Sequence, residues 1–303
     1  MRIAVTGASG LLGLNLCLKA STDYSVYGFT NSHTLKDAPF KTIPCDLLDW
    51  DATKKEIDTI RPKWLIHCAA MANVEECEKN PEAAWRINTD VSRKLAAFCT
   101  ESEIELVHIS TDAVFDGKMG GYTEEDLPNP LSMYAATKLE AEQEVLRENP
   151  GALVLRVNFY GFSLSGTRSL AEFFLENLTT GKMVNGFVDA MFCPLYVMDL
   201  VDMIFQMIDK KLSGLYHVVS PESLSKYTFG LRIADKFGLD KELIQPISVH
   251  ESGLSAKRSP RLTLSIEKLG KEKIFPPDQK KGIDQFFSDF QNGLPEKIKL
   301  FAL

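Results

Sequence analysis

Short apolar runs alternate with stretches of helical periodicity through the first half of this 303-residue chain. The runs have the length of buried strands, and the stretches between them place apolar residues three and four positions apart, as amphipathic helices do. We expect strands at Ile3–Thr6, Val26–Thr30, Thr42–Cys45, Trp64–Cys68, Leu106–Ser110 and Leu153–Val157. We expect helices at Leu11–Ala20, Ala52–Ile60, Pro81–Ser102 and Ser132–Glu148. This alternation predicts an α/β fold with a Rossmann-type doubly wound parallel sheet.

The regular alternation of predicted strands and helices ends after Asn158. Helices are expected at Ser169–Thr180, Val197–Lys210, Lys226–Phe237 and Lys281–Gln291, with an extended piece leading to Cys193 and a strand at Leu215–Val219. We therefore predict a Rossmann domain over residues 1–157 and a smaller C-terminal α/β lobe over residues 158–303. Part of the second half, about residues 197–219, is expected to return to the Rossmann sheet.

Composition narrows the class of protein. A net charge of −7, with basic residues clustered only as pairs, argues against a nucleic-acid-binding protein. No apolar stretch reaches the roughly 18 residues of a membrane span, and no charged-then-apolar leader precedes the first strand, so we expect a cytoplasmic protein. The six cysteines are scattered without ligand-like spacing, which predicts buried thiols and no metal site.

The turn after the first strand reads Gly-Ala-Ser-Gly-Leu-Leu-Gly over residues 7–13 and leads into a helix. Glycines at such a turn let the backbone approach a pyrophosphate, and the helix N-terminus offers N–H groups to the anion. The spacing Gly-x-x-Gly-x-x-Gly differs from the shorter Gly-x-Gly-x-x-Gly fingerprint, which indicates a different branch of dinucleotide-binding proteins. The predicted cofactor contacts from this loop are Gly7, Ser9, Gly10, Leu11, Leu12 and Gly13.

The end of the second strand lacks the acidic residue that holds the ribose 2′-hydroxyl of NAD. Thr30 and Asn31 stand there instead, followed by a histidine and a lysine. Since these neutral and basic groups tolerate a 2′-phosphate, we predict NADP(H) in preference to NAD(H). Asp46 and Leu47, after the third strand, are placed to meet the adenine, and an alternative role for Asp46 is to cap the next helix.

Tyr134 and Lys138 lie four residues apart in the predicted helix at Ser132–Glu148. Four residues correspond to about 400° of rotation, so both side chains leave one face of the helix. An ammonium beside a phenol favours the phenolate, and we expect it to lower the pKa of the tyrosine toward neutral pH. The pair suits proton transfer to a carbonyl oxygen.

The strand at Leu106–Ser110 ends in Ser-Thr-Asp-Ala-Val-Phe-Asp-Gly over residues 110–117. With this motif and the Tyr/Lys pair, the whole chain resembles the extended short-chain dehydrogenase/reductases. Within them it is similar to the dTDP-4-dehydrorhamnose reductase family, whose hallmark Ser-Thr-Asp-x-Val-Phe-Asp-Gly is matched throughout. Further matches are Cys-Ala-Ala at 68–70, Ile-Asn at 87–88, Leu-Arg at 155–156, Cys-Pro-Leu-Tyr-Val-Met-Asp at 193–199 and Ser-Pro-Arg at 259–261.

The resemblance implies an NAD(P)H-dependent reductase that acts on the 4-keto group of a nucleotide-activated deoxysugar. Tyr134 would protonate the ketone oxygen, Lys138 would lower its pKa and bind the nicotinamide ribose, and Thr111 would hold the oxygen. Asn88 would position its helix or a relay water. The cofactor cleft would further be lined by Cys68, Ala69, Ala70, Asn88 and Ser110, together with Tyr134 and Lys138.

The substrate contacts implied by the resemblance fall where the chain departs from the family pattern. The family's Thr-x-Val is Ala-Asn-Val here at residues 72–74, and its Trp-containing wall is replaced by Val-Asn-Phe-Tyr-Gly at 157–161. The aromatic residue that would stack on the sugar or base is Phe159 or Tyr160, and Arg261 would bind the diphosphate or else form a surface salt bridge. The implied contacts are Ala72, Val74, Thr111, Asp112, Asn158, Phe159 and Arg261.

The motifs bear on three other functions. A 4,6-dehydratase needs a Thr-Asp-Glu series in which the Glu acts as the general base. Ala113 occupies the position of that Glu, so the elimination lacks its base. An epimerase that retains its cofactor stays open as a second enzyme function. A non-catalytic NADP-binding regulator, like the β subunit of S-adenosylmethionine synthetase, stays open as well. A nucleotide-sugar substrate is expected, and the resemblance also points to a homodimer.

Overall fold

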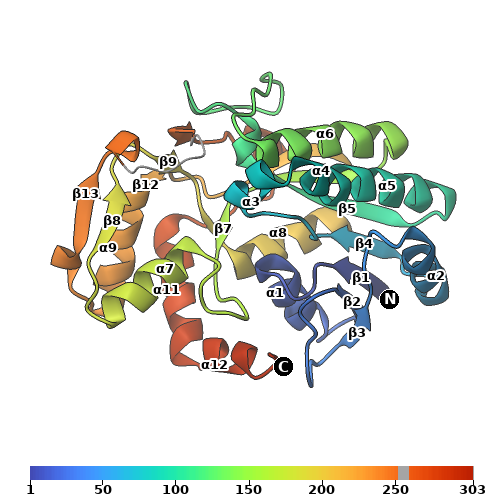
Figure 1. The fold of residues 1–303 in the computed structure, drawn as a ribbon, viewed down its shortest axis with the longest axis horizontal. Coiled ribbons are helices and arrows are strands. Elements are labelled where there is room, and N and C mark those ends of the chain that lie inside the picture. Colours follow the sequence, from blue (N-terminus) through green and yellow to red (C-terminus); the bar gives the residue numbers. More distant parts are fainter. Residues whose placement is uncertain (252–258, 303) are drawn as a thin grey trace.

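The computed structural model describes residues 1–251 and 259–302 of the chain. Its centre is a seven-stranded sheet in which every pairing is parallel (Figure 1). In spatial order the strands are β3 (Lys41–Pro44), β2 (Ser25–Thr30), β1 (Arg2–Thr6), β4 (Trp64–His67), β5 (Glu105–Thr111), β6 (Leu153–Val157) and β11 (Gly214–Val218). The predicted Rossmann-type fold class is confirmed. The seventh strand comes from the second half of the chain and pairs with β6.

Helices cover both faces of this sheet. Helices α1 (Leu11–Ala20) and α8 (Val197–Asp209) pack on one face, and α2 (Trp50–Ile60), α5 (Val91–Glu101) and α6 (Met133–Glu148) pack on the other. Alternate strand residues serve the two layers, as in β1, where Ile3 and Val5 belong to one core and Ala4 to the other. Strands buried on both faces explain why the sequence shows continuous apolar runs.

The single helix expected at Pro81–Ser102 is divided. It consists of α4 (Pro81–Trp85), a π-helical turn η1 (Arg86–Asp90) and α5, and it is preceded by a short helix α3 (Val74–Lys79) that the pattern did not predict. A π-turn inserts an extra residue into the helix, so the side chains after it are rotated relative to those before it. The position of this turn matters because it contains Asn88.

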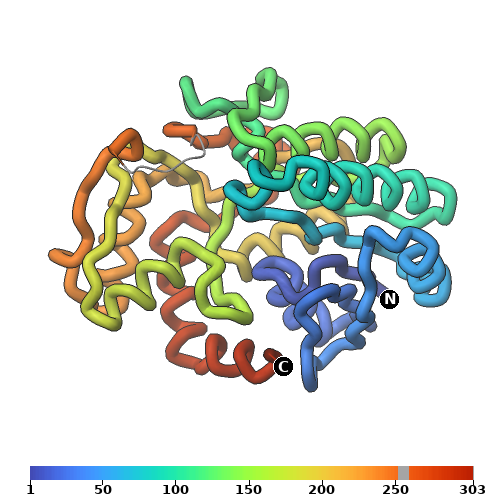
Figure 2. Tube along the Cα trace, in the orientation of Figure 1, coloured from blue at the N-terminus to red at the C-terminus, as the bar shows by residue number. Residues whose placement is uncertain are grey.

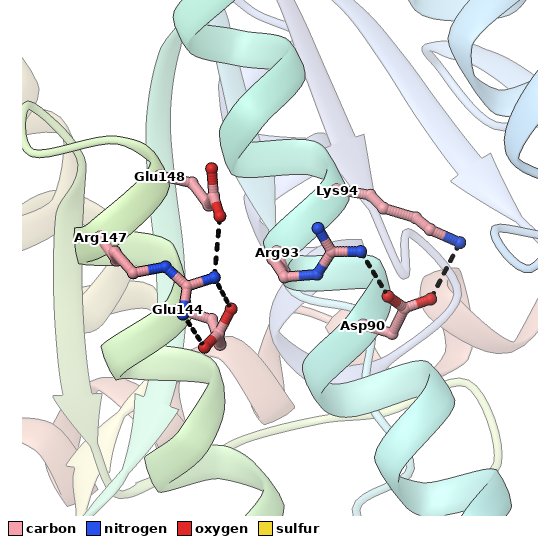
Figure 3. Close-up of polar contacts among 6 residues, drawn as sticks. All are labelled: Asp90, Arg93, Lys94, Glu144, Arg147 and Glu148. Carbon is pink, nitrogen blue, oxygen red and sulfur yellow. Dashed lines mark hydrogen bonds and ion pairs between the residues drawn. The ribbon is translucent and has the colours of Figure 1, made fainter.

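The outer surfaces of α5 and α6 carry ion pairs that close within each helix rather than between the two (Figure 3). Asp90 pairs with Arg93 and Lys94, and Arg147 pairs with Glu144 and Glu148. Such solvent-exposed pairs contribute roughly 0–1 kcal/mol each. The packing of the two helices therefore depends on the apolar residues buried beneath them, which include Leu95 and Val145.

Apart from α8 and β11, the residues after β6 form a lobe at one end of the sheet (Figures 1 and 2). Its strands form three small sheets: β7 (Phe159–Tyr160) with β10 (Leu195–Tyr196), β8 (Val184–Phe187) with β13 (Ile244–Ile247), and β9 (Met191–Phe192) between β12 (Leu224–Ser225) and β14 (Arg261–Leu262). Its helices are α7 (Leu170–Thr179), α9 (Lys226–Phe237), α10 (Glu267–Lys271), α11 (Gln279–Gln291) and α12 (Leu294–Lys299), with 3-10 turns η3 (Lys241–Leu243) and η4 (Val249–Glu251).

Aromatic rings fill the core between the lobe and the central sheet. Phe286 of α11 stacks on Phe162 at 4.2 Å between ring centroids and meets Tyr160 and Tyr196 edge-on. This core is continuous with the core beneath α1 and α8. Of the helices in the described residues, none is both long enough and apolar enough to cross a membrane.

Candidate active site

The carboxyl ends of the parallel strands meet at one edge of the sheet, and the predicted site residues follow these ends. Thr6, Thr30, His67 and Thr111 are the last residues of β1, β2, β4 and β5. In open α/β sheets, ligands bind in the crevice outside this edge. The topology therefore gathers into one region residues that lie far apart in the sequence.

The glycine loop makes a tight turn between β1 and α1. Gly7 has a φ of +68°, and a Cβ on it would lie 2.8 Å from the backbone N of Ala69. A Cβ on Gly13 would lie 2.2 Å from the carbonyl oxygen of Gly7, so neither position tolerates a side chain. Within the described residues, no side chain caps the N-terminus of α1. Its first-turn N–H groups therefore suit a pyrophosphate.

The ends of β2 and β3 carry the residues predicted to meet the adenosine. Thr30 is 2% exposed, and its hydroxyl has no hydrogen-bond partner among the described residues, whereas Asn31 beside it is exposed. An orphaned buried hydroxyl at this place fits a cofactor group that completes its bonding. Asp46 accepts from its own loop, at Leu48 N (3.0 Å), and Asp49 is the residue that caps α2. Asp46 is thus not the helix cap, and Leu47 next to it is buried.

Asn88 is fully buried in the π-turn and is bonded on both sides of its amide. Its oxygen accepts from Met71 N at 2.8 Å, and its nitrogen donates to Met71 O at 3.1 Å and to the Thr137 hydroxyl at 3.0 Å. These bonds join the segment at residues 68–71 to α6. Asn88 therefore links residues 68–71 to α6, the helix that carries Tyr134 and Lys138. Both ends of its amide are bonded to protein groups.

The motif after β5 points its polar groups in different directions. Ser110 is 3% exposed and donates to the carboxylate of Glu142, on the buried side of α6. The Thr111 hydroxyl accepts from Ala113 N at 3.1 Å and donates to Asp112 at 3.2 Å. Of the three, Thr111 and Asp112 face the lobe, because Asp112 accepts from Asn158 at 2.6 Å.

Tyr134 and Lys138 both lie in α6, which begins at Met133 after a side-chain cap by Ser132. Burial raises the pKa of Tyr134 to about 12, and hydrogen bonding with Thr111 acts in the opposite direction. Burial also lowers the pKa of Lys138 to about 8, while the charge on Glu142 raises it. The sequence led us to expect a lowered tyrosine pKa. In this structure desolvation of the phenolate is the largest effect on this pKa, so the expected lowering is not seen.

The other substrate candidates come from the start of the lobe and from the segment before α3. Phe159 is half-buried, whereas Tyr160 is 1% exposed and packs within the aromatic core, so of the two only Phe159 is placed to stack on a ligand. Ala72 is exposed and Val74 is half-buried at the start of α3.

Arg261 belongs to a segment that runs beside the β5 motif. Its backbone N–H donates to Gly117 O at 3.1 Å, and the hydroxyl of Ser259 donates to Phe115 O at 3.0 Å. The Arg261 side chain is exposed. These two bonds join the lobe to the β5 motif next to Arg261, the candidate diphosphate-binding residue.

Sequence reasoning missed a second layer of polar residues beneath the site. Glu142 forms a buried ion pair with Arg156 at 2.7 Å, and His108 lies 3.2 Å from the ammonium of Lys138. The spacing of both residues along the sequence could have identified them. Glu142 is one helical turn after Lys138, and His108 is two residues before Ser110, on the same face of its strand.

Comparisons with known proteins agree with this arrangement. The chain matches the family model of the RmlD substrate binding domain over residues 1–292. It is 30% identical over 298 residues to a probable low-salt glycan biosynthesis reductase of Haloferax volcanii, covering 95% of this chain and 99% of that protein. It is 33% identical over 277 residues to methionine adenosyltransferase 2 subunit beta of Danio rerio, covering 88% and 84%. The crystal structure of dTDP-4-dehydrorhamnose reductase from Bacillus anthracis in complex with NADP superposes with a TM-score of 0.86 at 27% identity, covering 95% and 99%.

Proposed function

Because this chain belongs to the RmlD substrate binding domain family, we propose that it reduces the 4-keto group of a nucleotide-activated deoxysugar with NADP(H). The observation that supports this most is the hydrogen bond between Thr111 and Tyr134, with Lys138 one helical turn further along α6, at the carboxyl edge of the sheet that also carries the Gly7–Gly13 loop. The likeness to a glycan biosynthesis reductase and to a dTDP-4-dehydrorhamnose reductase supports the same class of reaction.

The residues that would hold the cofactor follow the strand ends. The Gly7–Gly13 loop and the first turn of α1 would bind the pyrophosphate, Thr30 and Asn31 the adenosine ribose, and Lys138 the nicotinamide ribose. When bound, the reduced nicotinamide supplies a hydride to the carbonyl carbon. The absence of an acidic side chain at Thr30 and Asn31 favours NADPH. Tighter binding of NADH than of NADPH would contradict that preference.

Tyr134 is the proposed proton donor to the ketone oxygen. With its pKa near 12 it is protonated at neutral pH, as a donor must be, and its hydrogen bond with Thr111 places both hydroxyl groups at one point. Thr111 would hold the oxygen while the ketone is reduced to an alcohol. Lys138 would stabilise the phenolate that remains after the proton leaves.

The first prediction concerns this donor. Tyr134→Phe removes the phenolic proton and little volume, so we expect kcat to fall by about 10²- to 10⁴-fold while the affinity for NADPH stays within about twofold of wild type. The measurement is NADPH oxidation with a 4-keto-6-deoxy nucleotide sugar, together with fluorescence titration of NADPH.

Tyr160→Phe is a matched control, because Tyr160 is buried in the aromatic core and is not placed to reach a ligand. It should leave turnover unchanged. Equal rates for the Tyr134 variant and wild type would show that another group donates the proton.

A second function has an observation in its favour. The 33% identity to methionine adenosyltransferase 2 subunit beta supports a non-catalytic NADP-binding subunit as the alternative. Binding of NADPH without reduction of any 4-keto nucleotide sugar, together with stable complex formation with a methionine adenosyltransferase, would establish the alternative. Turnover of a 4-keto sugar without net NADPH consumption would instead indicate an epimerase that retains its cofactor.

A further inference from the structure

His108 lies directly beneath the ammonium of Lys138 in a fully buried position. Its Nε2 is 3.2 Å from Lys138 Nζ, and the two side chains are 0% and 3% exposed. They come from different elements: His108 lies in β5, and Lys138 lies in α6, which packs on the sheet. The imidazole is therefore fixed by the strand while the lysine is carried by the helix.

The protonation state of His108 follows from its surroundings. Burial lowers the pKa of His108 well below its usual range, and the charge on Lys138 acts in the same direction. A neutral imidazole has one acceptor nitrogen, and an ammonium can only donate. Nε2 must therefore be the acceptor, and the proton of His108 lies on Nδ1.

A second histidine supports the ring from the side. His67 lies 5.4 Å from His108 between ring centroids, with Nδ1 2.7 Å from the Thr6 hydroxyl and Nε2 3.0 Å from the Ser92 hydroxyl. Since Ser92 donates its own proton to Asn88 O, His67 must donate from Nε2. The two neighbouring histidines thus hold opposite tautomers, and His67 is locked by bonds at both nitrogens.

His108 itself is incompletely bonded. Its Nδ1 has no partner among the described residues, although it is buried. An unsatisfied buried donor costs stability, so the ring contributes through its contact with Lys138 rather than through a complete bonding network of its own.

We propose that His108 is a positioning residue for Lys138, whose neutral imidazole accepts one ammonium N–H and so directs the other two toward the cleft. This role in turnover rests on the function proposed above, whereas the tautomer does not. The residue acts through the lysine and touches neither the nucleotide sugar nor the hydride.

The contact between His108 and Lys138 predicts a pH dependence of turnover. Lys138 is faced by Glu142 from its own helix, by His67 and Cys68 from the end of β4, and by His108 from β5. With the pKa of Lys138 near 8, reduction should decline as pH rises through that value, because the charged lysine is lost. Removing an acceptor from the ammonium favours the neutral amine, so the decline should move to lower pH.

Two substitutions of His108 test whether an acceptor atom is needed at the place of its Nε2. In His108→Gln the amide oxygen reaches the place of Nε2, and in His108→Asn it reaches only the place of Nδ1. We expect the Gln variant to retain kcat within about threefold of wild type and to keep the alkaline decline near pH 8. We expect the Asn variant to lose about tenfold or more in kcat and to show the decline at lower pH. Equal profiles for the two variants would overturn the proposal.

A measurement on wild-type protein tests the same point without turnover. In ¹⁵N-histidine-labelled protein, the His108 signal, assigned by its loss in the Asn variant, should show a neutral Nδ1–H tautomer, and its Nε2 shift should titrate with Lys138 near pH 8. A proton on Nε2 would refute the proposal. If the tautomer is as expected but no 4-keto sugar is reduced by wild type, the proposed function fails while the contact to Lys138 stands.

Discussion

Asp112 is a carboxylic acid that lies almost wholly buried beside the proposed proton donor. Burial raises the pKa of Asp112 to about 6, and hydrogen bonds from Asn158 and Thr111 act in the opposite direction. A raised pKa means that the folded protein favours the protonated acid more than the unfolded chain does. The stabilisation is therefore complete below the unfolded value of 3.8 and is lost as pH rises through about 6.

Asp112→Asn should separate stability from function at this residue. The neutral amide avoids a buried charge, so we expect the free energy of unfolding to exceed that of wild type by about 1–3 kcal/mol at pH 7.5, with no gain at pH 4. Urea unfolding at both pH values measures this. Reduction should weaken, because the amide has one acceptor oxygen whereas the carboxylate uses two, one for Thr111 and one for Asn158.

Asp126→Asn provides a control of opposite sign. Hydrogen bonds from the backbone and side chain of Thr123 lower the pKa of Asp126. Removing the Asp126 carboxylate should therefore destabilise the protein at neutral pH. If Asp112→Asn also lowered stability at pH 7.5, its carboxylate would have to be better solvated or better paired than the structure shows.

Asn88 shows how a residue type alone leaves a role open. The sequence was consistent with a helix-positioning residue or a holder of a relay water. In the structure its amide is bonded to Met71 and Thr137, which favours the first interpretation. The difference lies in the π-turn, which rotates Asn88 toward the 68–71 segment and leaves no mark in the apolar pattern.

At the scale of elements, α6 joins the site to the sheet through one buried ion pair. Glu142 accepts from Ser110 on β5 and from both Nε and Nη2 of Arg156 on β6, and the Arg156 guanidinium lies 4.9 Å from the centre of the Phe115 ring. Both charged side chains are 3% exposed. Buried pairs of this kind contribute little relative to apolar residues, but removing one partner leaves an unpaired buried charge.

Glu142→Leu should therefore destabilise the fold strongly. We expect a loss of about 3–5 kcal/mol in the free energy of unfolding by urea, because Arg156 and Ser110 lose their partner. In the double variant Glu142→Leu/Arg156→Met most of this loss should be recovered. Strictly additive losses in the double variant would show that the two side chains do not depend on each other.

At the scale of the whole molecule, the end of the chain returns to the cofactor side of the sheet. After α12, Phe301 O accepts from Lys36 N at 2.9 Å, and Ala302 forms an antiparallel bridge with Leu35. Leu35 and Phe301 are each 7% exposed and belong to the main core. This C-terminal arm, residues 294–302, lies outside the span of the family match and holds the loop that follows Asn31.

Phe301→Ala should weaken this attachment. We expect a loss of about 3–5 kcal/mol in stability and about a tenfold weaker affinity for NADPH, since the loop after β2 loses its anchor. Thermal unfolding and NADPH titration measure the two effects. Leu300→Ala is the matched control, because Leu300 is 76% exposed and its removal should change neither. Unchanged NADPH affinity in the Phe301 variant would show that the arm does not order the adenosine side of the cleft.

The sequence by itself determined the parts that depend on local order. Apolar runs between helical patterns predict a parallel sheet, the glycines at 7–13 predict a tight turn before a helix, and Tyr134 and Lys138 share a face because helical geometry requires it. These features follow from spacing along the chain, so a linear pattern is enough to find them. The division into residues 1–157 and 158–303 stays a prediction.

Only the tertiary structure decided which side chains meet. His108 reaches Lys138 across 30 positions, Asn158 reaches Asp112 across 46, and Leu35 pairs with Ala302 from the far end of the chain. The direction of the tyrosine pKa was decided there too, because it depends on how much water the surrounding elements exclude. Burial and pairing between distant elements are properties of packing, and the periodicity of a sequence does not contain them.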